Sequence, residues 1–272
     1  MMKEIISELK KYECNILMQS GSSRYFSNDK IICFDDTDEI IKKSGMVFVV
    51  GGDGTIIYYA KEAAKFGKPV LGINGGKLGF LSVCEKNEIS KKICEVCAGN
   101  YTLSERLMLD FELEDKHFTA LNDIVINRNA DASVLRYGVS KDNKTICNYS
   151  ADGIIFATPT GSTAYSLSAG GAIVDKNLEC MILTPICPHT LATRSMILDT
   201  DDEIYLTIQN SENKNDEFFI SIDGDTFKQD LTENKIIKIK KSKLSAKFIE
   251  FEDYNFYDKI RKKLVVDIST DI

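Results

Sequence analysis

The chain has 272 residues, which is enough for one large domain or two of ordinary size. Its 43% hydrophobic and 28% charged residues are typical of a soluble globular protein and argue against a disordered or fibrous chain. A net charge of −7 argues against a general nucleic-acid binder, which needs a basic surface. No segment approaches the roughly 18 uninterrupted apolar residues of a membrane span, and the charged N-terminus lacks a signal-peptide core. We therefore expect a cytoplasmic protein with neither nucleic acid nor membrane as a partner.

The first hundred residues alternate between helical and strand patterns. We expect helices over 1–10, 35–44 and 56 to about 66, and strands over 15–19, 30–34, 47–50 and 69–74. The strand–helix–strand order of 47–74 predicts two parallel strands. Both strands end in glycines, at the sheet edge where open α/β folds bind ligands. Lys77 and Phe80 follow the second strand, and each has two possible roles. Lys77 either contacts a phosphate or is solvated, and Phe80 either forms the wall of a pocket or belongs to the core.

The turn Gly51-Gly52-Asp53-Gly54-Thr55 joins the first of these strands to its helix. Glycines let backbone N–H groups approach an anion and the helix N-terminus adds partial positive charge, so Gly51, Gly52, Gly54 and Thr55 are candidate phosphate-binding residues. A carboxylate repels phosphate, so Asp53 indicates a residue that meets a metal ion or accepts a proton from an attacking hydroxyl. The alternative is a tight turn in which Asp53 caps the helix.

From about residue 100 the pattern changes to short strands with polar turns between them. We expect strands over 102–114, 118–127, 133–139, 146–150, 153–158, 203–209, 218–223, 235–239 and 245–251. This change predicts an α/β domain with a parallel sheet over 1–100 and an all-β, sandwich-like domain over 101–251. The apolar stripe of 254–264 predicts a C-terminal helix that packs back on the first domain, to which 252–272 returns.

Three polar clusters in the second half are candidate binding residues. Asn122-Asp123 lies between apolar residues and Asp152 precedes Gly153, although both pairs also fit ordinary turns. The stretch from Thr158 to Gly171 is dense in small hydroxylated residues, which suits close contact with sugar, amide and purine groups. Tyr165 offers a flat surface for stacking, and a helix starting near Ser162 would aim its N–H groups at a ligand. The alternative is a capped helix that packs through small residues.

The order of these motifs resembles that of the NAD kinases, from about Gly45 to Leu264. The glycine turn alone is shared with 6-phosphofructokinases and diacylglycerol kinases, whereas Asn122-Asp123 and the Thr-Gly-Ser-Thr-Ala-Tyr-Ser stretch of 160–166 are far more selective. The resemblance implies an α/β domain plus a β-sandwich. It also implies that ATP or polyphosphate, with Mg²⁺, phosphorylates the 2′-hydroxyl of the adenosine ribose of NAD to give NADP. A lipid or sugar kinase of the same superfamily and a catalytically silent NAD sensor are the alternatives.

The resemblance further implies the roles of individual residues. Asp53 is the base, with Gly54 beside it near the NAD, and Asn122 and Asp123 hold the adenosine end. Asp152 lies near the nicotinamide portion. The dinucleotide pocket is lined by Phe80, Thr160, Thr163, Ala164, Tyr165, Ser166 and Ser168. NAD kinases are usually homo-oligomers, so we expect a dimer or tetramer. The chain departs from common family patterns at Ser150, where a basic residue is frequent, and at Asp225, where glutamine is frequent.

Overall fold

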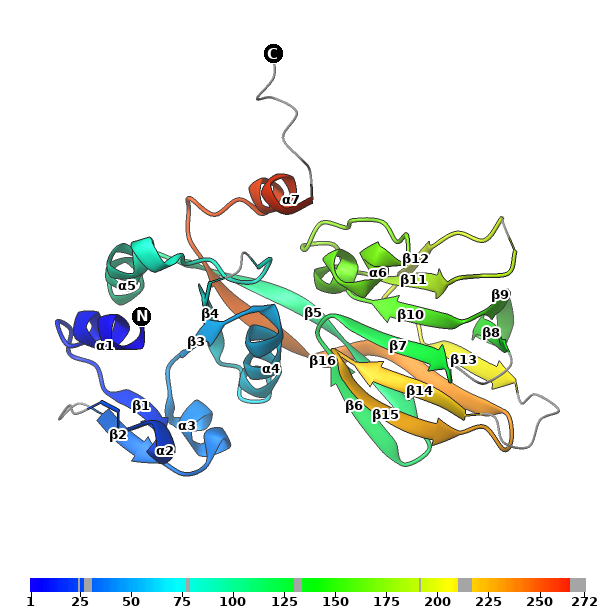
Figure 1. The fold of residues 1–272 in the computed structure, drawn as a ribbon, viewed down its shortest axis with the longest axis horizontal. Helices are drawn as coiled ribbons and strands as arrows, with labels where there is room; N and C mark the ends of the chain where they lie inside the picture. Colours follow the sequence, from blue (N-terminus) through cyan, green and yellow to red (C-terminus); the bar gives the residue numbers. More distant parts are fainter. Residues whose placement is uncertain are drawn as a thin grey trace, which may run out of the picture. The chain divides into compact units, whose positions relative to one another are not determined.

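The structure is a computed structural model that describes residues 1–23, 25–26, 31–76, 79–129, 134–190, 192–209 and 217–264 (Figure 1). It divides into two compact units, of which the first comprises Met1–Glu105 with Ala246–Ile272 and the second comprises Arg106–Ser245. The divisions fall inside two long strands, β5 (Thr102–Leu113) and β16 (Lys235–Glu250). The sequence places its domain boundaries at 100/101 and 251/252, just outside these strands.

The first unit contains the helices and strands expected from its sequence and three further helical segments outside the expected ranges, at 20–23, 86–88 and 89–97. They are α1 (Met2–Leu9), β1 (Ile16–Gln19), α2 (Ser20–Ser23), β2 (Ile31–Phe34), α3 (Thr37–Lys43), β3 (Val47–Gly51), α4 (Asp53–Ala64), β4 (Pro69–Asn74), η1 (Lys86–Glu88), α5 (Ile89–Cys97) and α7 (Phe256–Leu264). Local signals explain several of them. The Asp36 side chain caps α3 by accepting the Asp38 N–H at 3.0 Å. In α5, Ile89, Ile93 and Val96 recur at helical spacing and all three are buried.

Strands β3 and β4 are parallel, as predicted, and their register pairs Val47 with Val70 and Gly51 with Asn74. Their carboxyl ends therefore lie side by side, which brings the two glycine-rich segments to one edge. The C-terminal part of β16 extends this sheet by pairing in parallel with β4, at Lys247↔Pro69 and Phe248↔Val70. Helix α4 connects the two strands and packs against both of them; its buried apolar residues are Ile56, Ile57, Ala60, Ala63 and Ala64.

The C-terminal helix α7 packs against the first unit, as the sequence predicts (Figure 1). Its Phe256 is buried, and the Lys259 amine donates a hydrogen bond to the backbone carbonyl of Gly79 at 3.2 Å. The helix thereby reaches the segment that follows β4.

The second unit is a sandwich of two antiparallel sheets. One has the order β12-β11-β10-β7-β14-β15, and the other contains β13, β8 and β9 beside β16, with β5 and β6 joined to it. Its strands are β6 (Lys116–Ala120), β7 (Asp123–Arg128), β8 (Leu135–Lys141), β9 (Lys144–Ala151), β10 (Gly153–Ala157), β11 (Cys180–Ile186), β12 (Met196–Asp199), β13 (Ile204–Gln209), β14 (Glu217–Ile222) and β15 (Asp225–Asp230). Inward-facing residues of both sheets form one buried core that includes Phe111, Ile126, Phe156 and Leu206.

Four sequence predictions in this half are wrong in detail. The single strand expected over 118–127 is two strands, because the chain crosses between the sheets at Leu121-Asn122 while Leu121 stays buried. The two strands expected over 235–251 are one continuous strand. Strands β11, β12 and β15 have no counterpart in the prediction. The helix expected near Ser162 is a 3₁₀ turn, η2 (Thr160–Thr163), followed by one short α turn, α6 (Tyr165–Ser168).

Candidate active site

The glycine turn after β3 places Asp53 as the first residue of α4. Gly52 occupies the N-cap position, and no side chain caps the helix there. The interpretation of Asp53 as a helix cap is therefore wrong. Gly52, Gly54 and Thr55 are exposed around it, so the backbone N–H groups of the first turn are accessible to a ligand.

The Asp53 carboxylate instead reaches the segment that follows β4. Its Oδ2 accepts the Phe80 N–H at 2.9 Å, and its Oδ1 accepts the Leu81 N–H at 3.1 Å. Each carboxylate oxygen thus has its own backbone donor, which fixes the plane of the carboxylate. The side chain is 28% exposed and keeps a face open to solvent. Two glycine-rich segments that are 27 residues apart are joined by this one side chain.

The two strand ends approach each other closely enough to need glycine. The Gly75 N–H donates to the Gly51 carbonyl at 3.0 Å, and a Cβ atom on Gly75 would stand 3.0 Å from Gly51 Cα. Asn74 is buried beside them, where it accepts the Gly76 N–H and donates to Glu85 Oε2, both at 2.8 Å. Asn74 therefore stabilises this turn, a role that the sequence analysis did not predict. Lys77 lies outside the described residues.

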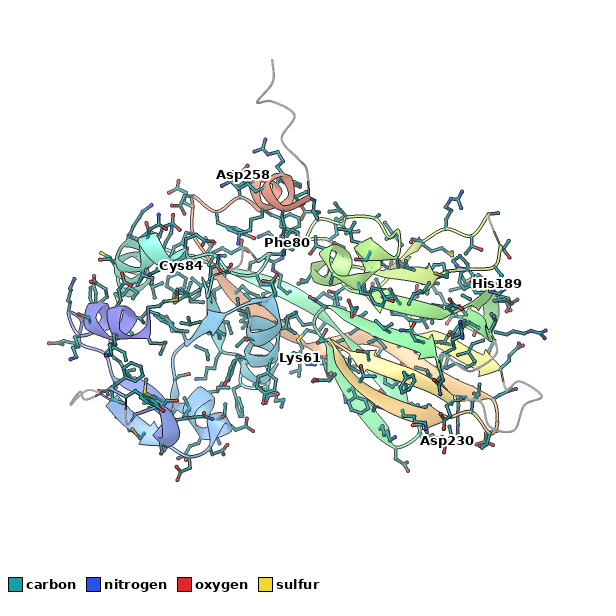
Figure 2. The ribbon with its side chains drawn as sticks, viewed as in Figure 1. Lys61, Phe80, Cys84, His189, Asp230 and Asp258 are labelled. Carbon is teal, nitrogen blue, oxygen red and sulfur yellow. The ribbon has the colours of Figure 1, made fainter. Side chains whose placement is uncertain are left out.

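Residues 79–82 are also held from the side of α7. The buried Lys259 amine donates to the carbonyls of Gly79 and Ser82, and burial lowers the pKa of this lysine. Figure 2 labels Phe80 below α7 and Asp258 on its upper, outward side. Phe80 is buried in this position. Both of its predicted roles, pocket wall and core residue, remain compatible with that burial.

In the second unit, one half-buried carboxylate, that of Asp223, organises the Asn122-Asp123 loop. Asp223 accepts the N–H groups of Leu121, Asn122 and Asp123 at 2.9, 2.7 and 3.1 Å. Asp223 lies in the two-residue hairpin turn between β14 and β15, where its φ of 51° and that of 94° at Gly224 suit the Asp-Gly pair. The sequence therefore indicates a hairpin turn here, and nothing local reveals that the side chain binds a loop 100 residues earlier.

Asp123 begins β7 and is 6% exposed. Burial, together with the negative charge of Asp223, raises the pKa of Asp123 to about 7, while a hydrogen bond from the Tyr165 backbone opposes that shift. The neighbouring Asn122 has a buried Oδ1 atom that accepts no hydrogen bond from any of the described residues. A buried polar atom without a partner costs free energy, so this amide is a candidate ligand contact.

The hydroxyl-rich stretch after β10 packs on the same loop. The Thr158 N–H donates to the Asn122 carbonyl at 2.8 Å, and its Oγ1 donates to the Leu121 carbonyl at 2.6 Å. A Cβ atom on Gly161 would stand 2.1 Å from the Asn122 carbonyl oxygen, so only glycine fits there.

Some side chains of this stretch are buried and others are exposed. Thr160 and Ser166 are buried, and the Ser166 hydroxyl is 3.0 Å from Thr184 Oγ1. Tyr165, at 43% exposure, and Ser168 are exposed. Thr163 and Ala164 are half-buried between them.

Asp152 lies at the other end of β7. It occupies the turn where the chain passes from β9 to β10, and its Oδ1 accepts a hydrogen bond from Arg128 Nε at 2.7 Å. Because Arg128 ends β7 and Asp123 begins it, the two acidic groups are about 16 Å apart at the usual rise per residue of a strand. The structure thus gathers Asn122, Asp123 and 158–168 at one end of the strand pair and leaves Asp152 at the other. The sequence did not single out Arg128.

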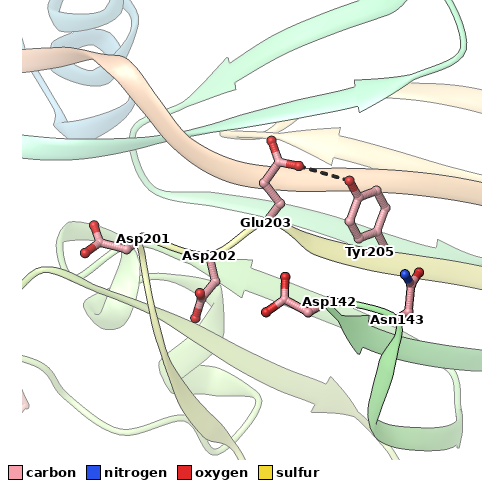
Figure 3. Close-up of a pocket in the computed structure, with 6 residues that line it drawn as sticks. All are labelled: Asp142, Asn143, Asp201, Asp202, Glu203 and Tyr205. Atoms are coloured by element: carbon pink, nitrogen blue, oxygen red, sulfur yellow. Dashed lines mark hydrogen bonds between the residues drawn. The ribbon is translucent and has the colours of Figure 1, made fainter.

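An open cavity of about 350 Å³ in the second unit involves none of these residues (Figure 3). It is lined by Asp142, Asn143, Asp201, Asp202, Glu203 and Tyr205. Glu203 accepts a hydrogen bond from the Tyr205 hydroxyl at 2.9 Å, and Lys141 pairs with Asp202. Its acidic lining does not suit a nucleotide, whose phosphates are anionic.

In the part of the chain that the structure describes, no group of three or more His, Cys, Asp or Glu side chains is arranged to hold a metal ion. No helix in the described ranges is long and apolar enough to span a membrane.

Comparisons with known proteins agree on one family. A model of the ATP-NAD kinase N-terminal domain matches residues 2–101, and one of the C-terminal domain matches 121–251. An NAD kinase of Caldanaerobacter subterraneus subsp. tengcongensis is 39% identical over 94% of this chain and 93% of its own. One from Thermoanaerobacter sp. (strain X514) is 43% identical over 83% of this chain and 80% of its own.

Two solved structures are similar to the whole chain. A yeast NADH kinase complexed with NADH superimposes with a TM-score of 0.85 at 28% identity, covering 98% of this chain and 84% of its own. An NAD kinase from Archaeoglobus fulgidus in complex with ATP gives 0.75 at 25% identity, covering 96% of this chain and 94% of its own.

Proposed function

This chain belongs to the NAD kinase family and phosphorylates NAD to NADP with ATP, and from that premise we propose which residues carry the reaction. The observation that best supports the proposal is the position of the Asp53 carboxylate, which two backbone N–H groups hold beside an exposed glycine turn.

Asp53 is the general base in this proposal. It accepts the proton of the ribose 2′-hydroxyl as the oxygen bonds to the terminal phosphorus of ATP, while the bond from that phosphorus to the bridging oxygen breaks and ADP leaves. A base must lie within hydrogen-bond reach of the hydroxyl, and fixing the carboxylate plane reduces its motion before the reaction. The N–H groups of Gly52, Gly54 and Thr55 bind the donor phosphates at the start of α4. Gly51 contributes by allowing the close approach of Gly75.

Mg²⁺ accompanies the donor in this proposal. Mg²⁺ is commonly bound by one or two carboxylates together with substrate phosphates, rather than by a cage of protein ligands. An ion carried mainly by the donor phosphates at the exposed turn fits that mode and leaves the Asp53 carboxylate available as the base. When bound, the ion neutralises phosphate charge in a protein whose own net charge is −7.

The second unit supplies the binding residues for NAD. Asn122 and Asp123 hold the adenosine end. The proposal is supported by the Asn122 Oδ1 atom, which has no partner among the described residues, and by the exposed ring of Tyr165, whose backbone bonds to Asp123. The other NAD-binding residues of this proposal are Thr160, Thr163, Ala164, Ser166 and Ser168 in the second unit, and Gly54 and Phe80 in the first. The buried hydroxyls of Thr160 and Ser166 act by shaping the loop. Asp152, oriented by Arg128, serves the nicotinamide portion.

We further propose that the protein works in the cytoplasm as a homo-oligomer, a dimer or tetramer. Both proposals rest on the family resemblance. Sedimentation of the purified protein decides the second of them, and a single monomeric species at micromolar concentration would reject it.

One assay tests the activity and its metal requirement. Purified protein is incubated with NAD, ATP and Mg²⁺, and NADP is measured with an NADP-specific dehydrogenase. We expect NADP with ATP, and none in excess chelator. Undiminished product in chelator removes the metal from the proposal. Parallel reactions with polyphosphate and with a lipid panel decide the donor and the alternative acceptors, while tight NAD binding without any turnover would favour the sensor.

A further inference from the structure

Lys263, in the last turn of α7, lies beside Asp53 and has no part in the reaction described above. Its Nζ atom is 3.7 Å from Asp53 Oδ2 and 4.1 Å from the centroid of the Phe80 ring. The Phe80 N–H donates to the same Oδ2 atom. Asp53, Phe80 and Lys263 therefore contact one another in a closed set of three, all within the first unit.

The ammonium of Lys263 has unused hydrogen-bonding capacity. At 3.7 Å its attraction to Asp53 is coulombic, because that distance is too long for a hydrogen bond. Within the described ranges it donates no hydrogen bond, and its side chain is 34% exposed. Lys259, one turn earlier, differs because its buried amine is already bonded to two backbone carbonyls. Lys263 is thus a cation held beside the proposed base with its N–H donors available.

We propose that Lys263 contacts the terminal phosphoryl group of the donor and exchanges its pairing with Asp53 for that contact when ATP binds. The inference rests on the proposed role of Asp53, because the base marks where the reacting phosphorus lies. The attacking hydroxyl is within hydrogen-bond reach of the base and in line with the phosphorus. An ammonium less than 4 Å from the carboxylate therefore reaches the oxygens of the same phosphoryl group.

The exchange also keeps the charges balanced during the step. The hydroxyl proton moves to Asp53 as the new O–P bond forms, and the electrons of the broken P–O bond leave with ADP. Asp53 thereby loses its negative charge. A lysine that paired only with Asp53 would then have no negatively charged partner. Lys263 stays protonated throughout and faces the transferring phosphoryl oxygens, where charge is spread in the transition state.

The test compares two nucleotides and two variants. Lys263→Met keeps the aliphatic stem over Phe80 and removes the charge. Its affinity for a non-hydrolysable ATP analogue should fall about tenfold to a hundredfold, the range for a lost hydrogen bond to a charged group. Its affinity for ADP, which lacks the terminal phosphate, should change by less than about twofold, because a twofold change in Kd corresponds to almost no change in binding free energy. In turnover, kcat should fall roughly a hundredfold with little change in the KM for NAD. Lys263→Arg should recover part of the loss.

Arg261→Ala is the matched control on the same helix. Arg261 is 73% exposed and pairs with Asp258, which Figure 2 shows on the outward side of α7. It should bind and turn over as the parent does. Equal losses for ATP analogue and ADP, or parent-like turnover in Lys263→Met with an unchanged melting temperature, would overturn the proposal. A parent enzyme that makes NADP while Asp53→Asn remains fully active would instead reject the role of Asp53, on which the proposal rests.

Discussion

A Cβ atom on Gly79 would stand 2.2 Å from Asp53 Oδ1. Residue 79 therefore has to be glycine for the carboxylate to reach the Phe80 and Leu81 N–H groups. We expect Gly79→Ala to displace Asp53, and turnover to fall by at least about tenfold, because a misplaced catalytic group loses much of its effect. Gly45→Ala is the control, since nothing lies within 4 Å of a Cβ atom there. Equal activity of the two variants, measured as NADP formed, would contradict this role for Gly79.

Asp53→Asn should cost both activity and stability. An asparagine has one acceptor oxygen, so its NH₂ group must face either the Phe80 or the Leu81 N–H, donor against donor. We expect the free energy of unfolding to fall by about 1–3 kcal/mol. Turnover should fall by roughly two to four orders of magnitude, the usual effect of a positioned general base. Melting temperature and NADP formation are measured on the same preparation. Retention of more than about a tenth of the parent turnover would contradict the assignment of Asp53 as base.

The Asn122-Asp123 loop should depend on Asp223. Asp223→Asn replaces one of two acceptor oxygens by a donor and so disrupts bonds to Leu121, Asn122 or Asp123. We expect a loss of about 1–3 kcal/mol in stability and a raised KM for NAD, with the KM for ATP little changed. The control is Asp225→Asn, an exposed position two residues later. Equal effects on the two KM values would show that the loop does not belong to the NAD site.

Asp123 should make stability depend on pH. Its pKa in the folded protein is about 7, against an ordinary value of 3.8. Between about pH 4 and pH 7 the folded state therefore binds more protons than the unfolded state, and the free energy of unfolding falls as pH rises. Above pH 7 this contribution is level. Asp123→Asn should lose this dependence and be more stable than the parent at pH 8, by up to a few kcal/mol.

Melting temperatures without NAD at pH 5 and pH 8 measure the effect of Asp123. Asp115→Asn, at an exposed position, should keep the dependence of the parent. From pH 5 to pH 8, the melting temperature of the parent should fall by more than that of Asp123→Asn. Equal changes in the two proteins would contradict a raised pKa of Asp123.

Local patterns predicted much of the fold and little of the side-chain contacts. The apolar run 47–50 with its glycine turn and the helical period of 254–264 depend on sequence neighbours, so periodicity was enough to find β3 and α7, although only Val49 and Phe256 of these segments are buried. Strand β11 was missed because it is buried on both faces and contains Pro185, so it shows no alternation. The break at Leu121-Asn122 was missed because burial continues across it.

The residues that orient the candidate site lie far along the chain from those they orient. Lys263 meets Asp53, and Asp223 meets Asn122, only after folding. Each of these residues has an ordinary explanation locally: Lys263 is a basic residue at a helix C-terminus, and Asp223 belongs to a hairpin turn. Such pairings depend on how the helices and strands pack together. A single sequence predicts the helices and strands themselves, but not which distant residues they bring into contact.

The course of β16 and α7 has a consequence for synthesis on the ribosome. The first unit begins the chain, yet the strand that pairs with β4 and the helix that reaches Asp53 come after residue 245. At the usual 5–20 residues per second, the ribosome adds the intervening second unit, Arg106–Ser245, in roughly seven to thirty seconds. Throughout that interval β4 has no partner on one side and the Asp53 carboxylate has no lysine beside it. The unit that is made first is therefore completed last, and an exposed strand edge of this kind is where a nascent chain is most open to chaperones or to aggregation.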